Sequence, residues 1–162
     1  MYSGSLSSIQ SQMDELLKTQ LLVGLKAESE SEGMDWDSLT LLRVLTAKAG
    51  LQFHLKIGGC EALSDIVASQ FLLVDCIIAP MVENTFSVFK FRNALQRANM
   101  QETNSKLLIE TAGGIENLSS ILASDISWIS GLNLGRSDLL GSLRSRDAEV
   151  SSFDSQIFKK YL

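Results

Sequence analysis

Short apolar runs alternate with amphipathic segments along most of the chain. The runs have the length of strands, and the segments between them repeat apolar residues at helical spacing. The expected strands lie near residues 21–26, 51–57, 72–79, 106–110 and 127–134. Continuously apolar strands separated by helices are typical of a parallel sheet with right-handed crossovers. The pattern therefore predicts an α/β fold with five strand–helix units.

Capping residues mark several of the expected helices. Residues 5–20 form a predicted amphipathic N-terminal helix, which precedes an α/β region over 21–162. Asp37 and Asn84 are candidate N-caps for the helices after the first and third strands, and Gly50 is a candidate stop. Further helices are expected over 61–69, 113–124 and, with a weaker pattern, 152–162.

Two architectures satisfy this pattern. A five-stranded doubly wound sheet fits a length of 162 residues, whereas a (β/α)8 barrel normally takes about 250 residues. Periodicity alone therefore favours an open sheet that is covered by helices on both faces. In either architecture, functional side chains gather at the carboxyl ends of the strands.

Composition narrows the class of protein. The chain is 45% hydrophobic and 20% charged, as expected for one soluble domain. It carries 14 Lys and Arg against 19 Asp and Glu, and this net charge of −5 argues against nucleic-acid binding. Neither a signal peptide nor a membrane-spanning run is evident. The two cysteines, Cys60 and Cys76, are too few for a disulfide framework, so we expect both to be free thiols. We expect a cytoplasmic protein that binds neither nucleic acid nor membrane.

Charged residues occur at the end of every expected strand. They are Lys26, Glu28 and Glu30 for the first strand, Lys56 for the second, Glu83 for the third, Glu110 for the fourth, and Arg136 and Asp138 for the fifth. Glu110 and Asp138 stand out because one β–α–β step separates them, so parallel strands would place them side by side. Two carboxylates suit Mg²⁺ or Mn²⁺, which prefer oxygen ligands. The alternative is that Glu110 caps the helix that follows it and Asp138 caps a last turn.

Other candidate sites are weaker. His54 is the only histidine and lies within an expected strand, so a structural role is favoured over a catalytic triad or a zinc site. Cys60 follows Gly58 and Gly59 at a turn, without an evident histidine to activate it. The glycine pairs of the chain match neither a dinucleotide-binding nor a P-loop motif.

Five ordered stretches resemble the HpcH/HpaI aldolase/citrate lyase family. They are Gly24-Leu25-Lys26-Ala27-Glu28, Leu55-Lys56-Ile57-Gly58-Gly59-Cys60-Glu61-Ala62, Ala79-Pro80-Met81-Val82-Glu83, Ile109-Glu110-Thr111-Ala112 and Gly135-Arg136-Ser137-Asp138-Leu139. The last two look like the family's metal-ligand motifs, ET after one strand and GxxDL after the next. The order and the intervals agree across about residues 21–143.

The resemblance implies a TIM (β/α)8-barrel type of fold, of which this chain would supply about five βα units and an N-terminal helix. It also implies a divalent-metal-dependent carbon–carbon lyase or aldolase that acts on a 2-keto acid, or a related acyl thioester, through an enolate. Glu110 and Asp138 would hold Mg²⁺ or Mn²⁺. Lys56 would be catalytic and would bind substrate together with Glu83 and Arg136.

The chain also departs from the family pattern. Lys56 stands near the position of an arginine and lacks its bidentate fork, and Leu108 stands where aldolase-type members often have a polar side chain. A closed barrel would need about three more βα units. We therefore expect a partial barrel that associates with its own copies or with a complementing chain. The alternatives are a non-catalytic half-barrel for association or small-ligand binding, and a doubly wound binding domain.

Overall fold

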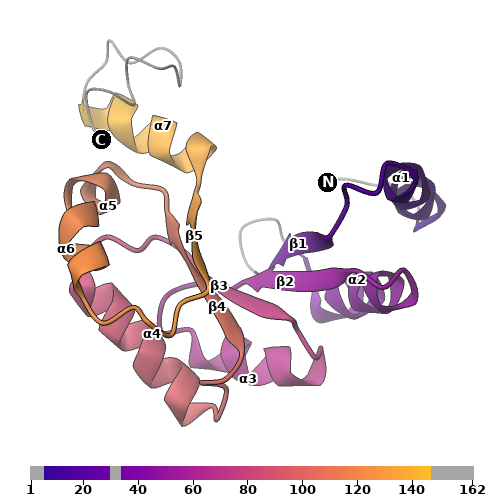
Figure 1. The fold of residues 1–162 in the computed structure, drawn as a ribbon, viewed down its shortest axis with the longest axis horizontal. Helices are drawn as coiled ribbons and strands as arrows, with labels where there is room; N and C mark the ends of the chain where they lie inside the picture. The colour runs from indigo at the N-terminus through magenta and orange to yellow at the C-terminus, as the bar shows by residue number, and fades with distance from the viewer. Residues whose placement is uncertain (1–5, 30–33, 147–162) are drawn as a thin grey trace.

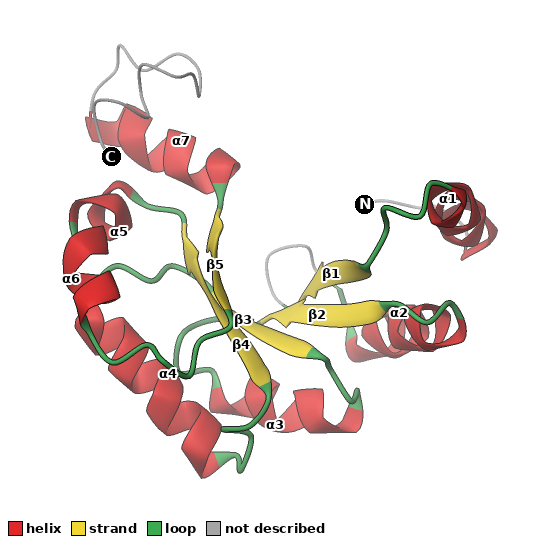
Figure 2. Ribbon diagram, in the orientation of Figure 1, coloured by secondary structure: helices red, strands yellow, loops and turns green. Residues whose placement is uncertain are grey.

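The computed structural model describes residues 6–29 and 34–146. Its strands are β1 (Gly24–Glu28), β2 (Gln52–Lys56), β3 (Cys76–Ala79), β4 (Asn104–Ile109) and β5 (Gly131–Leu134). Its helices are α1 (Leu6–Lys18), α2 (Trp36–Lys48), α3 (Leu63–Phe71), α4 (Thr85–Arg97), α5 (Ala112–Glu116), α6 (Leu118–Ala123) and α7 (Arg136–Arg146) (Figure 2). Every strand pairing is parallel, so the prediction of five parallel strands is confirmed. Glu30 and the expected helix over 152–162 lie outside the described residues.

The strands lie in the sheet in the same order as in the chain, β1-β2-β3-β4-β5. A doubly wound sheet reverses its strand order at a switch point, and no reversal occurs among these five strands. Helices α2 to α6 follow the outer side of the sheet in Figure 1. The doubly wound alternative is therefore wrong, and the architecture is that of an incomplete α/β barrel.

Alternating residues of each strand have different surroundings. The side chains that face the helices form the main core, with Phe53 and Leu55 of β2 and Leu107 of β4 fully buried. The opposite, inner face carries charged side chains and a small buried cluster of Cys76, Ile78 and Leu108. Because side chains alternate along a strand, the same five strands build a core on one face and present polar groups on the other.

The first strand begins later than expected. β1 starts at Gly24, whereas the apolar run begins at Leu21, and the side chains of Leu21 and Val23 are exposed. Lys26 and Glu28 therefore lie on the strand itself rather than after it. Their spacing of two residues directs both side chains to the inner face.

Two apolar runs are longer than the strands that they contain. The run at 72–79 begins in the turn after α3, where Leu73 has a φ of 49° and is exposed. The run at 127–134 begins in another turn, where Trp128 Nε1 donates a hydrogen bond to Asp125 O at 2.9 Å and its ring packs against Phe91. Apolar residues that anchor turns are indistinguishable from strand residues by hydropathy alone.

Most helix signals are confirmed. Asn84 caps α4 by accepting a hydrogen bond from Ser87 N, and Gly50 has a φ of 68° beyond the end of α2. The N-cap of α2 is Asp35 instead of Asp37, because the Asp35 carboxylate accepts from Ser38 N at 2.7 Å. The helix expected over 113–124 is divided at Asn117 into α5 and α6.

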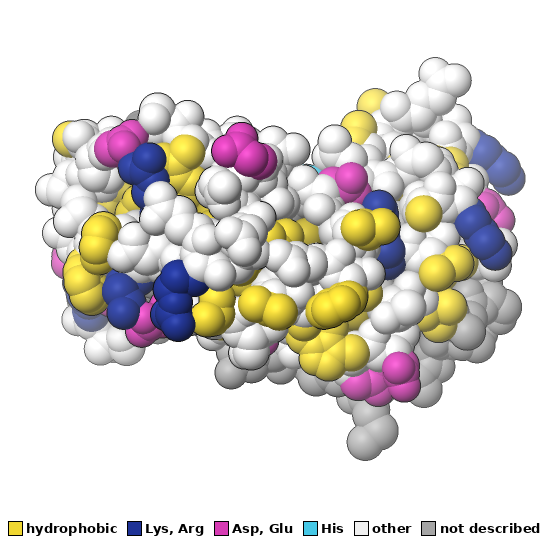
Figure 3. Space-filling model, turned by 90° about the horizontal axis from the view of Figure 1, so that it is seen from below, with side chains coloured by type: hydrophobic (Ala, Val, Ile, Leu, Met, Phe, Trp, Pro, Cys, Tyr) yellow, Lys and Arg dark blue, Asp and Glu magenta, His cyan; other side chains and the backbone are white. Residues whose placement is uncertain are grey.

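The outer surface over α3 and α4 carries exposed apolar side chains among charged ones. Figure 3 shows this side of the molecule. The exposed apolar residues of these two helices are Val67, Phe71, Phe86 and Phe89. In the described part of the chain, no helix combines the length and the hydropathy that a membrane crossing requires.

Candidate active site

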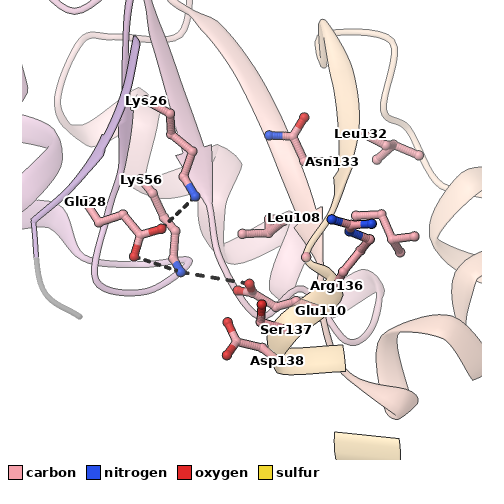
Figure 4. A pocket seen from close by; sticks show the side chains of 12 residues that line it. Lys26, Glu28, Lys56, Leu108, Glu110, Leu132, Asn133, Arg136, Ser137 and Asp138 are labelled. Atoms are coloured by element: carbon pink, nitrogen blue, oxygen red, sulfur yellow. Dashed lines mark ion pairs between the residues drawn. The ribbon is translucent and has the colours of Figure 1, made fainter. Parts of the chain in front are cut away.

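A pocket of about 760 Å³ lies at the carboxyl ends of the strands. Its lining includes Lys26, Glu28, Lys56, Glu110, Arg136 and Asp138 (Figure 4). Residues from β1, β2 and the segments after β4 and β5 therefore meet in one space, although more than 100 positions separate the first from the last. This is the edge of the sheet where barrel enzymes carry their functional groups.

Glu110 directly follows β4 and is 1% exposed. Its Oε1 accepts a hydrogen bond from Met81 N at 3.0 Å. The cap of α5 is Thr111, whose hydroxyl oxygen accepts from Gly114 N. The alternative that Glu110 caps the following helix is therefore wrong, and its carboxylate is directed into the pocket instead (Figure 4).

Asp138 lies in the first turn of α7 and is exposed. The backbone before this helix is fixed to β4, because Gly135 N donates to Ile109 O at 3.0 Å. Burial raises the pKa of Glu110, the Met81 amide and the Lys56 ammonium oppose this rise, and the neighbouring Asp138 carboxylate adds to it. The structure thus brings Glu110 and Asp138 together, as their strand-end positions predict.

An alternating series of charges connects β1 with Glu110. Lys26 Nζ lies 2.6 Å from Glu28 Oε1, and Lys56 Nζ lies 3.3 Å from Glu28 Oε2. Lys56 Nζ is also 3.9 Å from Glu110 Oε2. Glu28 is 7% exposed and Lys56 is 9% exposed. Charges this buried need partners of opposite sign, and each of these groups has one.

Glu28 is a site residue that sequence reasoning did not single out. It is the register partner of Lys56 in the β1–β2 pair. Neighbouring residues in register on one face of a sheet have adjacent side chains, and opposite charges there attract. The alternation of Lys26 and Glu28 was a usable signal, but the register that connects it to Lys56 is not visible in the sequence.

Gly135 has a steric role in the site. A Cβ at this position would lie 2.6 Å from Glu110 Cβ and 2.7 Å from Glu110 Oε2. No side chain can therefore be added here unless Glu110 moves. In the sequence this glycine is the first residue of the GxxDL stretch, and the structure shows that it leaves space for the Glu110 carboxylate.

The remaining predicted substrate residues are placed differently from one another. Arg136 lines the pocket, but its side chain is directed away from Glu110 and Asp138 (Figure 4). Glu83 is not among the lining residues, and its side chain lies beside Gly113 at the start of α5. The structure therefore places Lys56 beside Glu110, in the same pocket as Asp138, and leaves Glu83 outside the pocket lining.

The histidine and the thiols are held in structural contacts. The Nε2 atom of His54 lies 3.0 Å from Gln52 Oε1, and burial lowers the pKa of His54, with Lys106 adding to this effect. Burial raises the pKa of Cys60 to about 11, and its Sγ donates to Pro80 O at 3.2 Å. A thiol with such a pKa is a poor nucleophile at neutral pH.

The donor set fits a hard divalent cation. Within residues 6–29 and 34–146, no group of three or more His, Cys, Asp or Glu side chains could hold a metal. Glu110 and Asp138, which line the same pocket, would supply two carboxylates, and water or substrate oxygens would complete the coordination. Mg²⁺ is commonly bound by one or two carboxylates with several waters, and a cation would also offset the repulsion between the carboxylates.

Solved structures share this fold. The citrate synthase SbnG superimposes with a TM-score of 0.67 over 91% of this chain at 16% identity. An HpcH/HpaI aldolase from Desulfitobacterium hafniense DCB-2 gives 0.68 over 91% at 14% identity. An HpcH/HpaI aldolase/citrate lyase family protein from Burkholderia cenocepacia J2315 gives 0.66 over 93% at 14% identity. The fold is that of the HpcH/HpaI aldolases.

The match covers only part of these structures. The chain spans 64% of the SbnG structure, 65% of the D. hafniense structure and 69% of the B. cenocepacia structure. No protein-family model and no curated protein sequence matches the chain. The motif resemblance and the structural likeness agree on the fold.

Proposed function

We propose that this chain supplies the metal- and substrate-binding wall of a divalent-metal-dependent carbon–carbon lyase. The substrate class is a 2-keto acid, or a related acyl thioester, that reacts through an enolate. The observation that carries the proposal is the meeting of Glu110 and Asp138 in one pocket with Lys56 beside them. Glu110 and Asp138 also occupy the matching positions in the two motifs that resemble the metal-ligand motifs of the HpcH/HpaI family, whereas Lys56 stands near the position of an arginine.

Glu110 and Asp138 would hold the cation, which when bound supplies Lewis-acid stabilisation of negative charge on the substrate oxygens. Glu110 is suited to this role because burial and the Met81 amide fix its orientation. A fixed ligand loses little conformational entropy when it binds. Asp138 is exposed and therefore accessible from the pocket.

Lys56 provides positive charge at the same place. Its ammonium can donate hydrogen bonds to a substrate carboxylate or to the oxygen of an enolate, and such charge-assisted bonds are strong. Leu108 lines the pocket with an apolar side chain. An apolar wall keeps water away from charge that develops on the substrate and strengthens the electrostatic interactions there.

Association with further copies of the chain, or with a complementing chain, is part of the proposal. In the described sheet, β1 and β5 each pair with a strand on one side only. Such edges favour pairing with another chain. Light scattering of the purified protein measures this directly, and a monodisperse monomer would contradict it.

The test of function has two stages. Mn²⁺ binding is followed by water-proton relaxation, and exchange of the pyruvate methyl protons in D₂O is followed by NMR with and without metal. Proton exchange reports enolate formation without requiring knowledge of the second substrate. The parent protein should bind Mn²⁺ and exchange the protons only when metal is present.

The decisive variant is Glu110→Gln, which should bind Mn²⁺ at least tenfold more weakly, since loss of charge weakens a carboxylate ligand. Glu102→Gln is the matched control, because Glu102 is exposed and lies outside the pocket lining. If Glu110→Gln binds the ion as well as the parent, the assignment is wrong. Metal binding without any proton exchange would instead favour a small-ligand-binding role.

A further inference from the structure

One carboxylate joins the two loops that follow β1 and β2. Asp65, in the first turn of α3, accepts two hydrogen bonds at the same oxygen. Its Oδ2 lies 2.7 Å from Ser29 Oγ and 2.8 Å from Gly58 N. Ser29 directly follows Glu28, and Gly58 is two residues beyond Lys56. Asp65 itself is not part of the pocket lining.

Ser29 completes the connection between the two strands. Its backbone N donates to Lys56 O at 3.1 Å, while its hydroxyl is bonded to Asp65. The pair of Glu28 with Lys56 is the last in the register of β1 with β2. The contacts of Ser29 and Asp65 therefore hold the strand ends just where the two charged side chains leave the backbone.

We propose that Asp65 is a positioning residue that holds the Glu28–Lys56 ion pair in place and, through it, keeps the Lys56 ammonium beside Glu110. β1 is an edge strand in the described sheet, with β2 as its neighbour. The position of Glu28 consequently depends on the β1–β2 ladder and on the loop contacts that follow it. Oxalate binding as a test of this role rests on the proposed function, whereas the NMR signal of Lys56 does not.

A competing explanation is that Asp65 only stabilises α3. A carboxylate in the first turn of a helix interacts favourably with the helix dipole. A substitution that acts in this way would lower stability without changing the Lys56 environment. The experiment must therefore separate an effect on stability from an effect that passes through Lys56.

A double-mutant cycle provides this separation. Oxalate binding to the Mn²⁺-loaded protein is measured by calorimetry for the parent, Asp65→Ala, Lys56→Met and the double variant. Asp65→Ala should weaken oxalate binding about tenfold in the parent background and have no further effect in the Lys56→Met background. Asp65→Asn should restore most of the affinity, because its amide oxygen can accept both hydrogen bonds.

Asp35→Ala is the matched control. Asp35 also accepts a hydrogen bond at a helix start, from Ser38 N at 2.7 Å, but it is exposed and lies outside the pocket lining. Its substitution should lower stability and leave oxalate affinity unchanged. Ser29→Ala removes only one of the two bonds to Asp65, so it serves as a milder variant if Asp65→Ala fails to fold.

Unchanged oxalate affinity in Asp65→Ala, or an equal loss in the Lys56→Met background, would overturn the proposal. If the parent binds neither Mn²⁺ nor oxalate, the proposed function fails, and the inference is then decided by NMR. The Lys56 Cε–Hε signal, assigned with Lys56→Met, should shift in Asp65→Ala and return in Asp65→Asn. A signal that stays at its parent position in all Asp65 variants would refute the positioning role.

Discussion

The two faces of the sheet differ in what their side chains do. On β2, Phe53 and Leu55 are fully buried against the helices. His54 and Lys56, which alternate with them along the strand, lie on the inner face. One face gains its free energy from apolar burial, and the other holds compensated charges. Stability and chemistry are therefore assigned to alternate residues of the same strands, and substitutions on the two faces should have separable effects.

The largest expected effect is on the core face. Phe53→Ala should lower the free energy of unfolding by about 3–5 kcal/mol, because it removes a fully buried ring and leaves a cavity. His54→Ala, its neighbour on the inner face, should cost less than about 1 kcal/mol. Urea denaturation measures both. Equal losses would show that the two faces do not differ in their contribution to stability.

Gly135→Ala tests the close approach of the Gly135 backbone to the Glu110 side chain on the inner face. The added Cβ would overlap Glu110, so we expect a loss of about 1–3 kcal/mol in stability. Mn²⁺ affinity should fall at least tenfold, since the carboxylate must move. Gly141→Ala is the control, because a Cβ there meets no atom within 4 Å and alanine favours a helix. Unaltered Mn²⁺ binding in Gly135→Ala would contradict the steric role.

The raised pKa of Glu110 gives a prediction in pH. A metal ligand must be deprotonated, so Mn²⁺ affinity should fall as the pH drops through this raised pKa, which lies above the ordinary value of 4.5. The stability of the metal-free protein should change with pH in the opposite direction. A carboxyl with a raised folded-state pKa contributes stability that is fully present below its unfolded pKa and is lost as the pH rises through its folded pKa.

Glu110→Gln should remove both effects, because the amide does not titrate in this range. Mn²⁺ titrations and urea denaturation between pH 4 and pH 8 measure them. If the parent and Glu110→Gln have parallel stability profiles over this range, the pKa of Glu110 is not raised in the folded protein.

The strands were predictable because a short run of apolar residues is a local signal in the sequence. The ends of the strands were less predictable, because apolar turn residues such as the partly buried Trp128 have the same hydropathy as strand residues. The strand order was not predictable from periodicity, since doubly wound sheets and barrels share the same alternation of elements. Only the motif resemblance favoured the barrel over the open sheet.

The candidate site was predictable to a similar extent. The positions of Glu110 and Asp138 after neighbouring parallel strands were sufficient to place them together. The roles of Glu28, Asp65 and Gly135 depend on register and on contacts between loops, and these are set by tertiary structure. Glu83 shows the reverse case, because a position after a strand did not bring its side chain into the pocket.

The smallest expected effect concerns Lys26. Its side chain is 45% exposed, compared with 11% for Lys56, although both ammonium groups contact Glu28. An exposed ion pair contributes less than about 1 kcal/mol and is screened by salt. Lys26→Met should therefore change the free energy of unfolding by less than that amount, and the difference should vanish at high salt. Lys56→Met should cost more, because it leaves Glu28 and Glu110 without their shared buried counter-charge. Urea denaturation at low and high salt compares the two variants, and equal, salt-sensitive losses would show that burial does not distinguish these lysines.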